Sequence, residues 1–128
     1  MKQKLSCLLI DDDRDDQEIF KLALHDVNED VFCQTADDGI KGLHMLQTDA
    51  SFTPSYIFLD LNMPRMTGKD CLSAIKSNPL LASIPVVIYS TSSDPKDIQD
   101  TKDLGAADYV VKQYSIASLK EILRRYFN

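Results

Sequence analysis

Two short apolar runs in this chain each end at an aspartate. The run CLLI is followed by Asp11 and Asp12, and the run YIFL is followed by Asp60. Runs of this length are typical of buried strands in a parallel sheet, and the ligands of such sheets bind beyond the carboxyl ends of the strands. We therefore expect acids from two separate strands to share one edge of a sheet.

Carboxylates that crowd together at such an edge are unstable unless a cation holds them. Hard carboxylate oxygens with little else nearby suit Mg²⁺, which keeps several waters and leaves room for a phosphate oxygen. The acids thus predict a place where a metal ion, a carboxylate and a phosphoryl group can meet.

Strand patterns alternate with helical patterns along the whole chain. The predicted strands span residues 4–10, 31–35, 56–59, 85–90 and 107–112. The predicted helices span residues 15–27, 39–47, 68–77, 95–104 and 115–127. This alternation is typical of βαβ units and therefore of a parallel sheet covered by helices. It indicates a single domain over residues 1–128, with no linker and no appended output domain.

Apolar residues recur at helical spacing in each predicted helix. Those expected to face the core are Phe20, Leu24, Val27, Ile40, Leu43, Leu46, Leu72, Ile75, Ile116, Leu119, Leu123 and Tyr126. The fourth helix has a thin apolar stripe, chiefly Ile98 and Leu104, so we expect it to pack loosely. Asp15 and Asp16 lie in the first turn of the first helix, where they complement the helix dipole.

The composition is that of a globular protein and argues against two classes of partner. The 128 residues carry a formal net charge of −6, so a nucleic-acid backbone would be repelled overall. The apolar stretch after Lys4 is too short for a signal peptide or a membrane span. Cys7, Cys33 and Cys71 are widely spaced and form no C-x-x-C pair, which indicates reduced thiols in a cytoplasmic protein.

Taken together, these residues resemble a known family, the response-regulator receiver domains that histidine kinases phosphorylate in two-component signalling. The resemblance covers essentially the whole chain. It rests on an acidic pair after the first strand, an aspartate closely followed by Asn-Met-Pro after the third, a glycine in the next loop, a hydroxyl residue ending the fourth strand and a lysine ending the fifth. It implies a flavodoxin-like, doubly wound α/β fold with five helices and five parallel strands in the order 2-1-3-4-5.

The resemblance also implies roles for the acids. Asp60 would be the phosphoacceptor, because a carboxylate can attack phosphorus and form an acyl phosphate. Asp11, Asp12 and Asp60 would bind Mg²⁺, together with the backbone carbonyl of Asn62. The plain alternatives are that Asp60 is a capping aspartate in a turn and that the other acids are solvated loop residues. Solvation is the strongest alternative for Asp13. Because three acids follow one another, the assignment of the two metal ligands could be displaced by one residue.

Three further residues match positions with roles in the family. Ser90 would donate its hydroxyl to a phosphoryl oxygen, with a plain Ser/Thr turn as the alternative. Lys112 ends an otherwise apolar strand and would pair with Asp60 at rest and with phosphate afterwards. Tyr109 matches the aromatic switch residue, which would swing in from the surface once phosphate draws Ser90 inward. A surface aromatic is the alternative for Tyr109.

One position departs from the family pattern. The fifth strand of the family usually ends in Lys-Pro with a cis peptide, whereas this chain has Lys112 followed by Gln113. A cis bond before a residue other than proline costs about 3–4 kcal/mol, so we predict a trans peptide here. Lone receivers associated with bacterial phytochromes lack this proline in a similar way, and residues 77–93 also resemble theirs.

The function that follows is phosphoryl transfer from a kinase phosphohistidine to Asp60 with Mg²⁺, followed by slow self-hydrolysis. One rival is a Mg²⁺-dependent phosphatase with an aspartyl nucleophile, but such enzymes carry a second acid two residues later, where this chain has Asn62. The other rival is a degenerate receiver that only binds a partner, which the full residue set argues against. The expected kinase is a histidine kinase, with a phytochrome-like one as the candidate.

The signal is expected to leave by protein–protein contact with an unknown downstream protein. The expected surface comprises the fourth helix, the fifth strand and the fifth helix. This surface carries acids on one element and bases on another, and a homodimer could pair them across its interface. The acids are Asp97, Asp100 and Asp103, and the bases are Lys120, Arg124 and Arg125. The alternative is that these are solvated helix faces of little energetic value.

Overall fold

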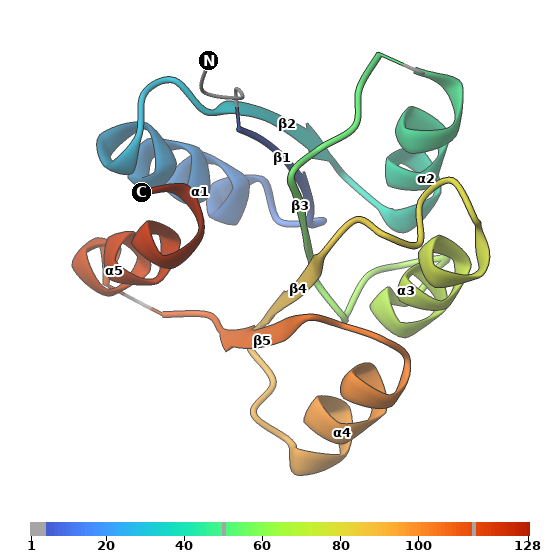
Figure 1. The fold of residues 1–128 in the computed structure, drawn as a ribbon. Coiled ribbons are helices and arrows are strands. Elements are labelled where there is room, and N and C mark those ends of the chain that lie inside the picture. The colour runs from blue at the N-terminus through green and yellow to red at the C-terminus, as the bar shows by residue number, and fades with distance from the viewer. Residues whose placement is uncertain (1–4, 50, 114) are drawn as a thin grey trace.

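A computed structural model describes residues 5–49, 51–113 and 115–128 of the chain. The strands are β1 (Ser6–Ile10), β2 (Phe32–Ala36), β3 (Tyr56–Leu59), β4 (Val86–Ser90) and β5 (Asp108–Val111). The helices are α1 (Arg14–Val27), α2 (Gly39–Thr48), α3 (Gly68–Ser77), α4 (Pro95–Asp103) and α5 (Ile116–Phe127). Strands and helices alternate strictly along the chain, as the sequence pattern predicts (Figure 1).

The strands form one parallel sheet in the order β2-β1-β3-β4-β5. The predicted order and the flavodoxin-like, doubly wound architecture are therefore confirmed. In this order β1 and β3 are neighbours, and Ile10 is the register partner of Leu59. The aspartates that follow these two residues consequently emerge side by side at the carboxyl edge of the sheet.

Helices cover both faces of the sheet (Figure 1). Helices α1 and α5 pack together on one face, and α2, α3 and α4 lie on the other. Successive strand residues point to opposite faces, so Cys7 and Leu9 join the core beneath α1 and α5, while Leu8 and Ile10 join the core beneath α2 and α3. Burial on both faces explains why the inner strands β1, β3 and β4 are largely apolar without alternation, whereas the edge strands β2 and β5 are partly exposed.

The predicted bounds of β3 and α3 are those observed, and the other elements differ by a residue or two. The first strand begins at Ser6, and its predicted start, Lys4, lies outside the described residues. Side-chain caps set several helix starts. Asp13, Thr67 and Ser115 each accept a hydrogen bond from a backbone N–H of the helix that follows.

Three isoleucines predicted to face the core are exposed instead, namely Ile40, Ile98 and Ile116. In α2 the reason is close packing through glycine. A Cβ atom at Gly42 would lie 2.5 Å from Cδ1 of Ile10, so α2 presents Gly42 to the sheet and turns Ile40 outward. In α4 the one buried residue is Thr101, which agrees with the loose packing expected of this helix.

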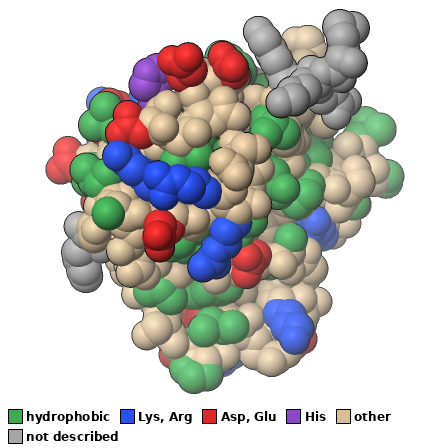
Figure 2. Space-filling model, turned by 60° about the vertical axis from the view of Figure 1, so that its left-hand side comes forward, with side chains coloured by type: hydrophobic (Ala, Val, Ile, Leu, Met, Phe, Trp, Pro, Cys, Tyr) green, Lys and Arg blue, Asp and Glu red, His purple; other side chains and the backbone are tan. Residues whose placement is uncertain are grey.

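The surface mixes charges of both signs. On the face in Figure 2, basic and acidic side chains are interspersed among hydrophobic and polar ones. None of the helices in the described part of the chain is long and apolar enough to cross a membrane.

Candidate functional site

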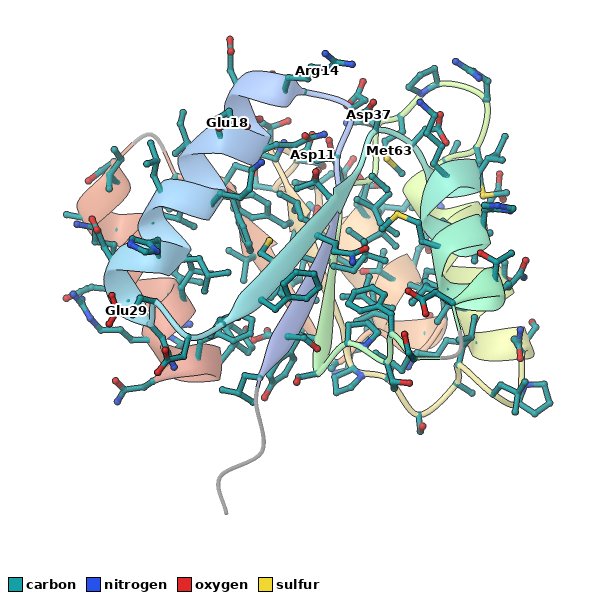
Figure 3. The ribbon with its side chains drawn as sticks, turned by 90° about the horizontal axis from the view of Figure 1, so that it is seen from above. Asp11, Arg14, Glu18, Glu29, Asp37 and Met63 are labelled. Atoms are coloured by element: carbon teal, nitrogen blue, oxygen red, sulfur yellow. The ribbon has the colours of Figure 1, made fainter. Side chains whose placement is uncertain are left out.

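The carboxyl edge of the sheet collects the residues that the sequence singles out. Asp11 follows β1, Asp60 follows β3, Ser90 ends β4 and Lys112 follows β5. Backbone hydrogen bonds fix three of them. The N–H groups of Asp11, Asp60 and Lys112 donate to the carbonyls of neighbouring strands at 3.0, 3.0 and 2.8 Å. Figure 3 shows Asp11 beyond the end of β1, on the same edge as Asp37 and Met63.

Three carboxylates meet at this edge. Asp11, Asp12 and Asp60 each offer an oxygen, and these atoms all lie within 4.8 Å of one another. Asp11 is fully buried and Asp60 is 6% exposed, whereas Asp12 is open to solvent. The cluster is therefore accessible from the side of Asp12, and the acids predicted to come together do so.

Lys112 is the cation of this site. Its Nζ lies 2.8 Å from Oδ2 of Asp11 and 3.4 Å from Oδ2 of Asp60. The same nitrogen lies 2.8 Å from Oδ2 of Asp16. The lysine side chain is 10% exposed, and its Nζ sits 5.4 Å from the centre of the Tyr89 ring. The predicted pairing of Lys112 with Asp60 is present, but the lysine lies closer to two other carboxylates.

Burial dominates the electrostatics of the acids. It raises the pKa of Asp11 to about 6, although hydrogen bonding to Lys112 and to the backbone N–H of Asp13 acts in the opposite direction. Burial likewise raises the pKa of Asp60 against the charge of Lys112. For Lys112, burial disfavours the ammonium, but bonds to Asp11 and Asp16 outweigh it and raise the pKa. The cluster thus carries more negative charge than one lysine compensates.

The donor set fits a hard divalent cation. Oδ1 of Asp11 accepts from the N–H of Asp13, and Oδ1 of Asp60 accepts from the N–H of Leu61. The second oxygen of each carboxylate faces Lys112 Nζ and is the atom that a metal ion would share or take over. Within the described residues, Oδ2 of Asp11 is buried without a well-directed hydrogen bond, although Lys112 Nζ is 2.8 Å away. Oxygen ligands of this kind, open to water on one side, suit Mg²⁺ or Mn²⁺.

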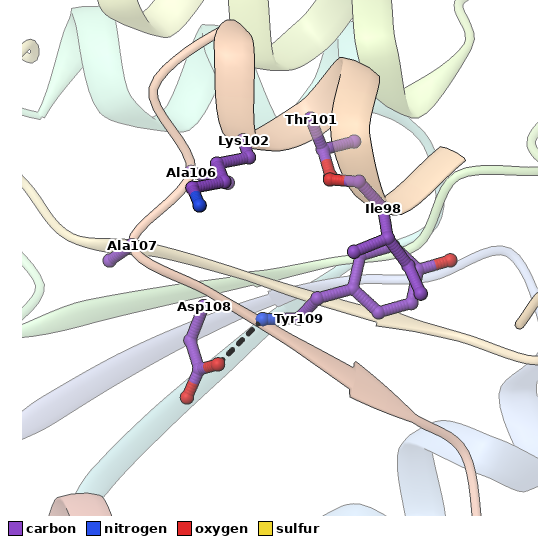
Figure 4. A pocket seen from close by; sticks show the side chains of 7 residues that line it. All are labelled: Ile98, Thr101, Lys102, Ala106, Ala107, Asp108 and Tyr109. Carbon is purple, nitrogen blue, oxygen red and sulfur yellow. Dashed lines mark hydrogen bonds between the residues drawn. The ribbon is translucent and has the colours of Figure 1, made fainter. Parts of the chain in front are cut away.

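The loop after β4 links Ser90 to Tyr109. Ser90 is fully buried, and its Oγ accepts a hydrogen bond from the N–H of Ser92 at 3.2 Å. The Tyr109 hydroxyl donates to the carbonyl of Ser92 at 2.7 Å. Tyr109 was expected at the surface before phosphorylation, but its ring is half-buried. It borders a pocket of about 290 Å³ between α4 and β5 (Figure 4).

Two residues of the site were missed by the sequence analysis. Asp16 was assigned only to the helix dipole, yet it contacts Lys112. Gln17 is buried, and its Nε2 donates to the carbonyl of Asp11 at 2.6 Å and to Asp37 at 3.1 Å. A polar residue at a core-facing position of the first helix is the signal that could have revealed Gln17. Asn62 is exposed, and its carbonyl remains a predicted ligand.

The peptide between Lys112 and Gln113 is trans, as predicted, because the described residues contain no cis peptide. The lysine therefore reaches the acids without the cis bond that usually follows it in the family.

A parallel α/β sheet with clustered acids, a lysine and a buried hydroxyl at its carboxyl edge defines the class of protein. The model of the response regulator receiver domain matches residues 7–124, which is most of the chain. The chain belongs to this family, whose members accept phosphoryl groups from histidine kinases and bind Mg²⁺ or Mn²⁺ at an acidic pocket.

Individual members of the family are similar to this chain over most of its length. The two-component response regulator ORR12 of Oryza sativa subsp. japonica is 34% identical over 91% of this chain and 93% of its own length. The phosphorylated cyanobacterial phytochrome response regulator RcpA superposes with a TM-score of 0.88, at 30% identity over 96% of this chain and 91% of its own. The Mn²⁺-bound response regulator Rcp1 gives a TM-score of 0.83 at 28% identity, over 94% and 90%.

Proposed function

We propose that Asp60 accepts a phosphoryl group from a histidine kinase and that the phosphorylated protein signals by contact with another protein. The observation that carries this proposal is the position of the Asp60 carboxylate. It shares a cluster with the carboxylates of Asp11 and Asp12, its Oδ2 lies 3.4 Å from Lys112 Nζ, and the residue is 6% exposed. A nucleophile there would have the Lys112 ammonium and a metal held by the acidic cluster as neighbouring cations.

Each residue of the site has its own role in the proposed phosphoryl transfer. An oxygen of Asp60 attacks phosphorus while the bond to the kinase histidine breaks. Lys112, already 3.4 Å from Asp60, pairs with a phosphoryl oxygen. Ser90 lies on the neighbouring strand with a buried hydroxyl that can donate to another phosphoryl oxygen.

Asp11, Asp12, Asp60 and the carbonyl of Asn62 would hold Mg²⁺. When bound, this ion supplies positive charge that offsets the charge of the transferring group. Two carboxylate oxygens are already fixed by backbone N–H groups, so the acids need little rearrangement to bind it.

The proposed donor is a phytochrome-like histidine kinase. Support comes from the similarity to the cyanobacterial phytochrome response regulator RcpA, at 30% identity over nearly the whole of both chains. The proposal includes a cytoplasmic location, where the free thiols of Cys7, Cys33 and Cys71 would remain reduced.

The proposed output surface is formed by α4, β5 and α5, with Tyr109 at its centre. Tyr109 contacts the loop between β4 and α4 through the carbonyl of Ser92 and also borders the pocket beside α4. A change at Ser90 would therefore reach α4 through two hydrogen-bonded neighbours.

Intact-mass spectrometry with acetyl phosphate as the donor tests this function. The wild-type protein should gain one phosphoryl group in the presence of Mg²⁺ and little after chelation. Asp60→Asn should gain none, whereas Asp15→Asn, which alters an exposed neighbouring acid, should behave as wild type. A wild-type protein that gains no phosphate, or an Asp60→Asn variant that gains as much, would overturn the proposal.

A further inference from the structure

Lys112 has a partner that stands outside the acidic cluster. Its Nζ contacts three carboxylates, and two of them, Asp11 and Asp60, belong to the cluster suited to a metal. The third is Asp16, in the first turn of α1. We propose that Asp16 is a positioning residue that holds Lys112 in place when the other two carboxylates turn to the metal. This inference rests on the proposed phosphoryl-transfer function.

The backbone of Asp16 is fixed by the cap of α1. Oδ1 of Asp13 accepts hydrogen bonds from the N–H groups of Asp15 and Asp16 at 2.9 and 3.2 Å, which anchors the start of α1. The Asp16 side chain is 32% exposed, so it meets Lys112 at the rim of the site. A carboxylate carried on this anchored backbone gives the lysine a partner whose position does not depend on the metal.

The need for such a partner follows from hydrogen-bond counting. An ammonium has three N–H groups, and all three have a carboxylate within reach. Cation binding at Asp11 and Asp60 competes for their oxygens. The bond to Asp16 is the one that persists, and it leaves the remaining N–H groups free to meet oxygens of a phosphoryl group on Asp60.

The same geometry predicts what happens without Asp16. Lys112 would then pair with Asp11 and Asp60 alone and would compete with the cation for their oxygens. A matched comparison is available in Asp15, which is exposed, lies in the same helical turn and makes no ion pair within the described residues. Removing either acid costs one negative charge and one helix-dipole contact, but only Asp16 touches Lys112.

The test measures Lys112 directly. In protein labelled with ¹⁵N-lysine, the Lys112 ammonium resonance is assigned as the signal lost in Lys112→Arg. We expect it to shift and to exchange faster with solvent in Asp16→Ala than in Asp15→Ala. Asp16→Asn keeps one oxygen acceptor and should restore most of the wild-type signal. All variants must first give wild-type circular dichroism spectra.

The second readout is binding affinity. Each variant is titrated first with Mg²⁺ and then, with Mg²⁺ present, with beryllofluoride, a phosphoryl mimic whose binding is detected by ¹⁹F NMR. Asp16→Ala should bind beryllofluoride about tenfold more weakly than Asp15→Ala, and Asp16→Asn should recover much of the loss. Equal affinities and equal Lys112 signals in Asp16→Ala and Asp15→Ala would overturn the inference. Wild-type protein that binds Mg²⁺ but no beryllofluoride would overturn the proposed function, whereas a perturbed Lys112 signal in Asp16→Ala would still support the placement of the lysine by Asp16.

Discussion

Gly68, the first residue of α3, lies directly against the main-chain carbonyl of Asp60. A Cβ atom at position 68 would sit 2.2 Å from that oxygen, far inside contact distance. The N–H of Gly68 also donates to the carbonyl of Leu61 at 2.8 Å, which closes the loop. Arg65 within this loop has a positive φ of 68°. The absence of a side chain at residue 68 therefore lets α3 begin against the phosphoacceptor segment.

We expect Gly68→Ala to lower the free energy of unfolding by about 3 kcal/mol, because the methyl group meets rigid backbone atoms. It should also weaken Mg²⁺ binding by displacing Asp60. Gly39→Ala is the control, since the nearest atoms to its Cβ would be side-chain atoms of Met66 and Cys71, at 3.1 and 3.3 Å, and the change should cost less than about 1 kcal/mol. Urea denaturation measures the free energy of unfolding of both variants. Equal values would contradict the close packing of Gly68 against the carbonyl of Asp60.

The buried charge of Asp11 predicts an unusual dependence of stability on pH. Its pKa is raised to about 6 in the folded protein from an ordinary value of 3.8. Between these values the folded state binds more protons than the unfolded chain. The free energy of unfolding contributed by this group is therefore highest below that window and falls as the pH rises through it.

Asp11→Asn should consequently stabilise the metal-free protein at pH 7, by about 1–3 kcal/mol. Lys112 keeps Asp16 and Asp60 as partners, so no charge is stranded. Urea denaturation at pH 5 and pH 7 measures the effect. Asp12→Asn should give a smaller gain because that carboxylate is already solvated. A destabilised Asp11→Asn variant would show that its carboxylate contributes favourably to folding.

Tyr109→Phe removes the hydrogen bond to the carbonyl of Ser92. We expect a loss of about 1 kcal/mol and faster hydrogen exchange in the loop between β4 and α4. Tyr126→Phe, which loses a bond to Asp108 at the surface, should leave that loop unchanged. Unaltered hydrogen exchange in Tyr109→Phe would show that the Tyr109 hydroxyl does not restrain the loop between β4 and α4.

We expect beryllofluoride with Mg²⁺ to increase self-association through α4, β5 and α5. Several of the acids and bases proposed for this contact already pair within the protein: Lys69 with Asp97 and Asp100, and Lys120 with Asp26. Dimer formation must compete with these pairs, so the test targets Arg124 and Arg125, which are exposed. Sedimentation should show the mass increase in the wild type and a smaller one in Arg124→Glu. If the mass of the wild type does not change with beryllofluoride, these residues form a solvated helix face and not a dimer contact.

The apolar runs that end in Asp11 and Asp60 were enough to predict the sheet edge, because strand direction and burial are local consequences of sequence. Contacts across the fold were harder to predict. Asp16 meets Lys112 from 96 residues away, and nothing in the local pattern distinguishes it from Asp15. Ile40 is apolar at helical spacing, yet it points outward because Gly42 brings α2 close to Ile10. Such contacts depend on how elements pack, which a one-dimensional pattern does not contain.

The most direct test of the central claim is to locate the phosphoryl group itself. Protein treated with acetyl phosphate and Mg²⁺ is reduced with borohydride, which converts an aspartyl phosphate to homoserine, and then mapped by tandem mass spectrometry. Among the described residues of the acidic cluster, Asp60 is the one that follows β3, and its carboxylate lies 3.4 Å from Lys112 Nζ and within 4.8 Å of the other two acids. We predict homoserine at position 60 alone. Homoserine at position 11, 12 or 16, with position 60 unmodified, would contradict the account.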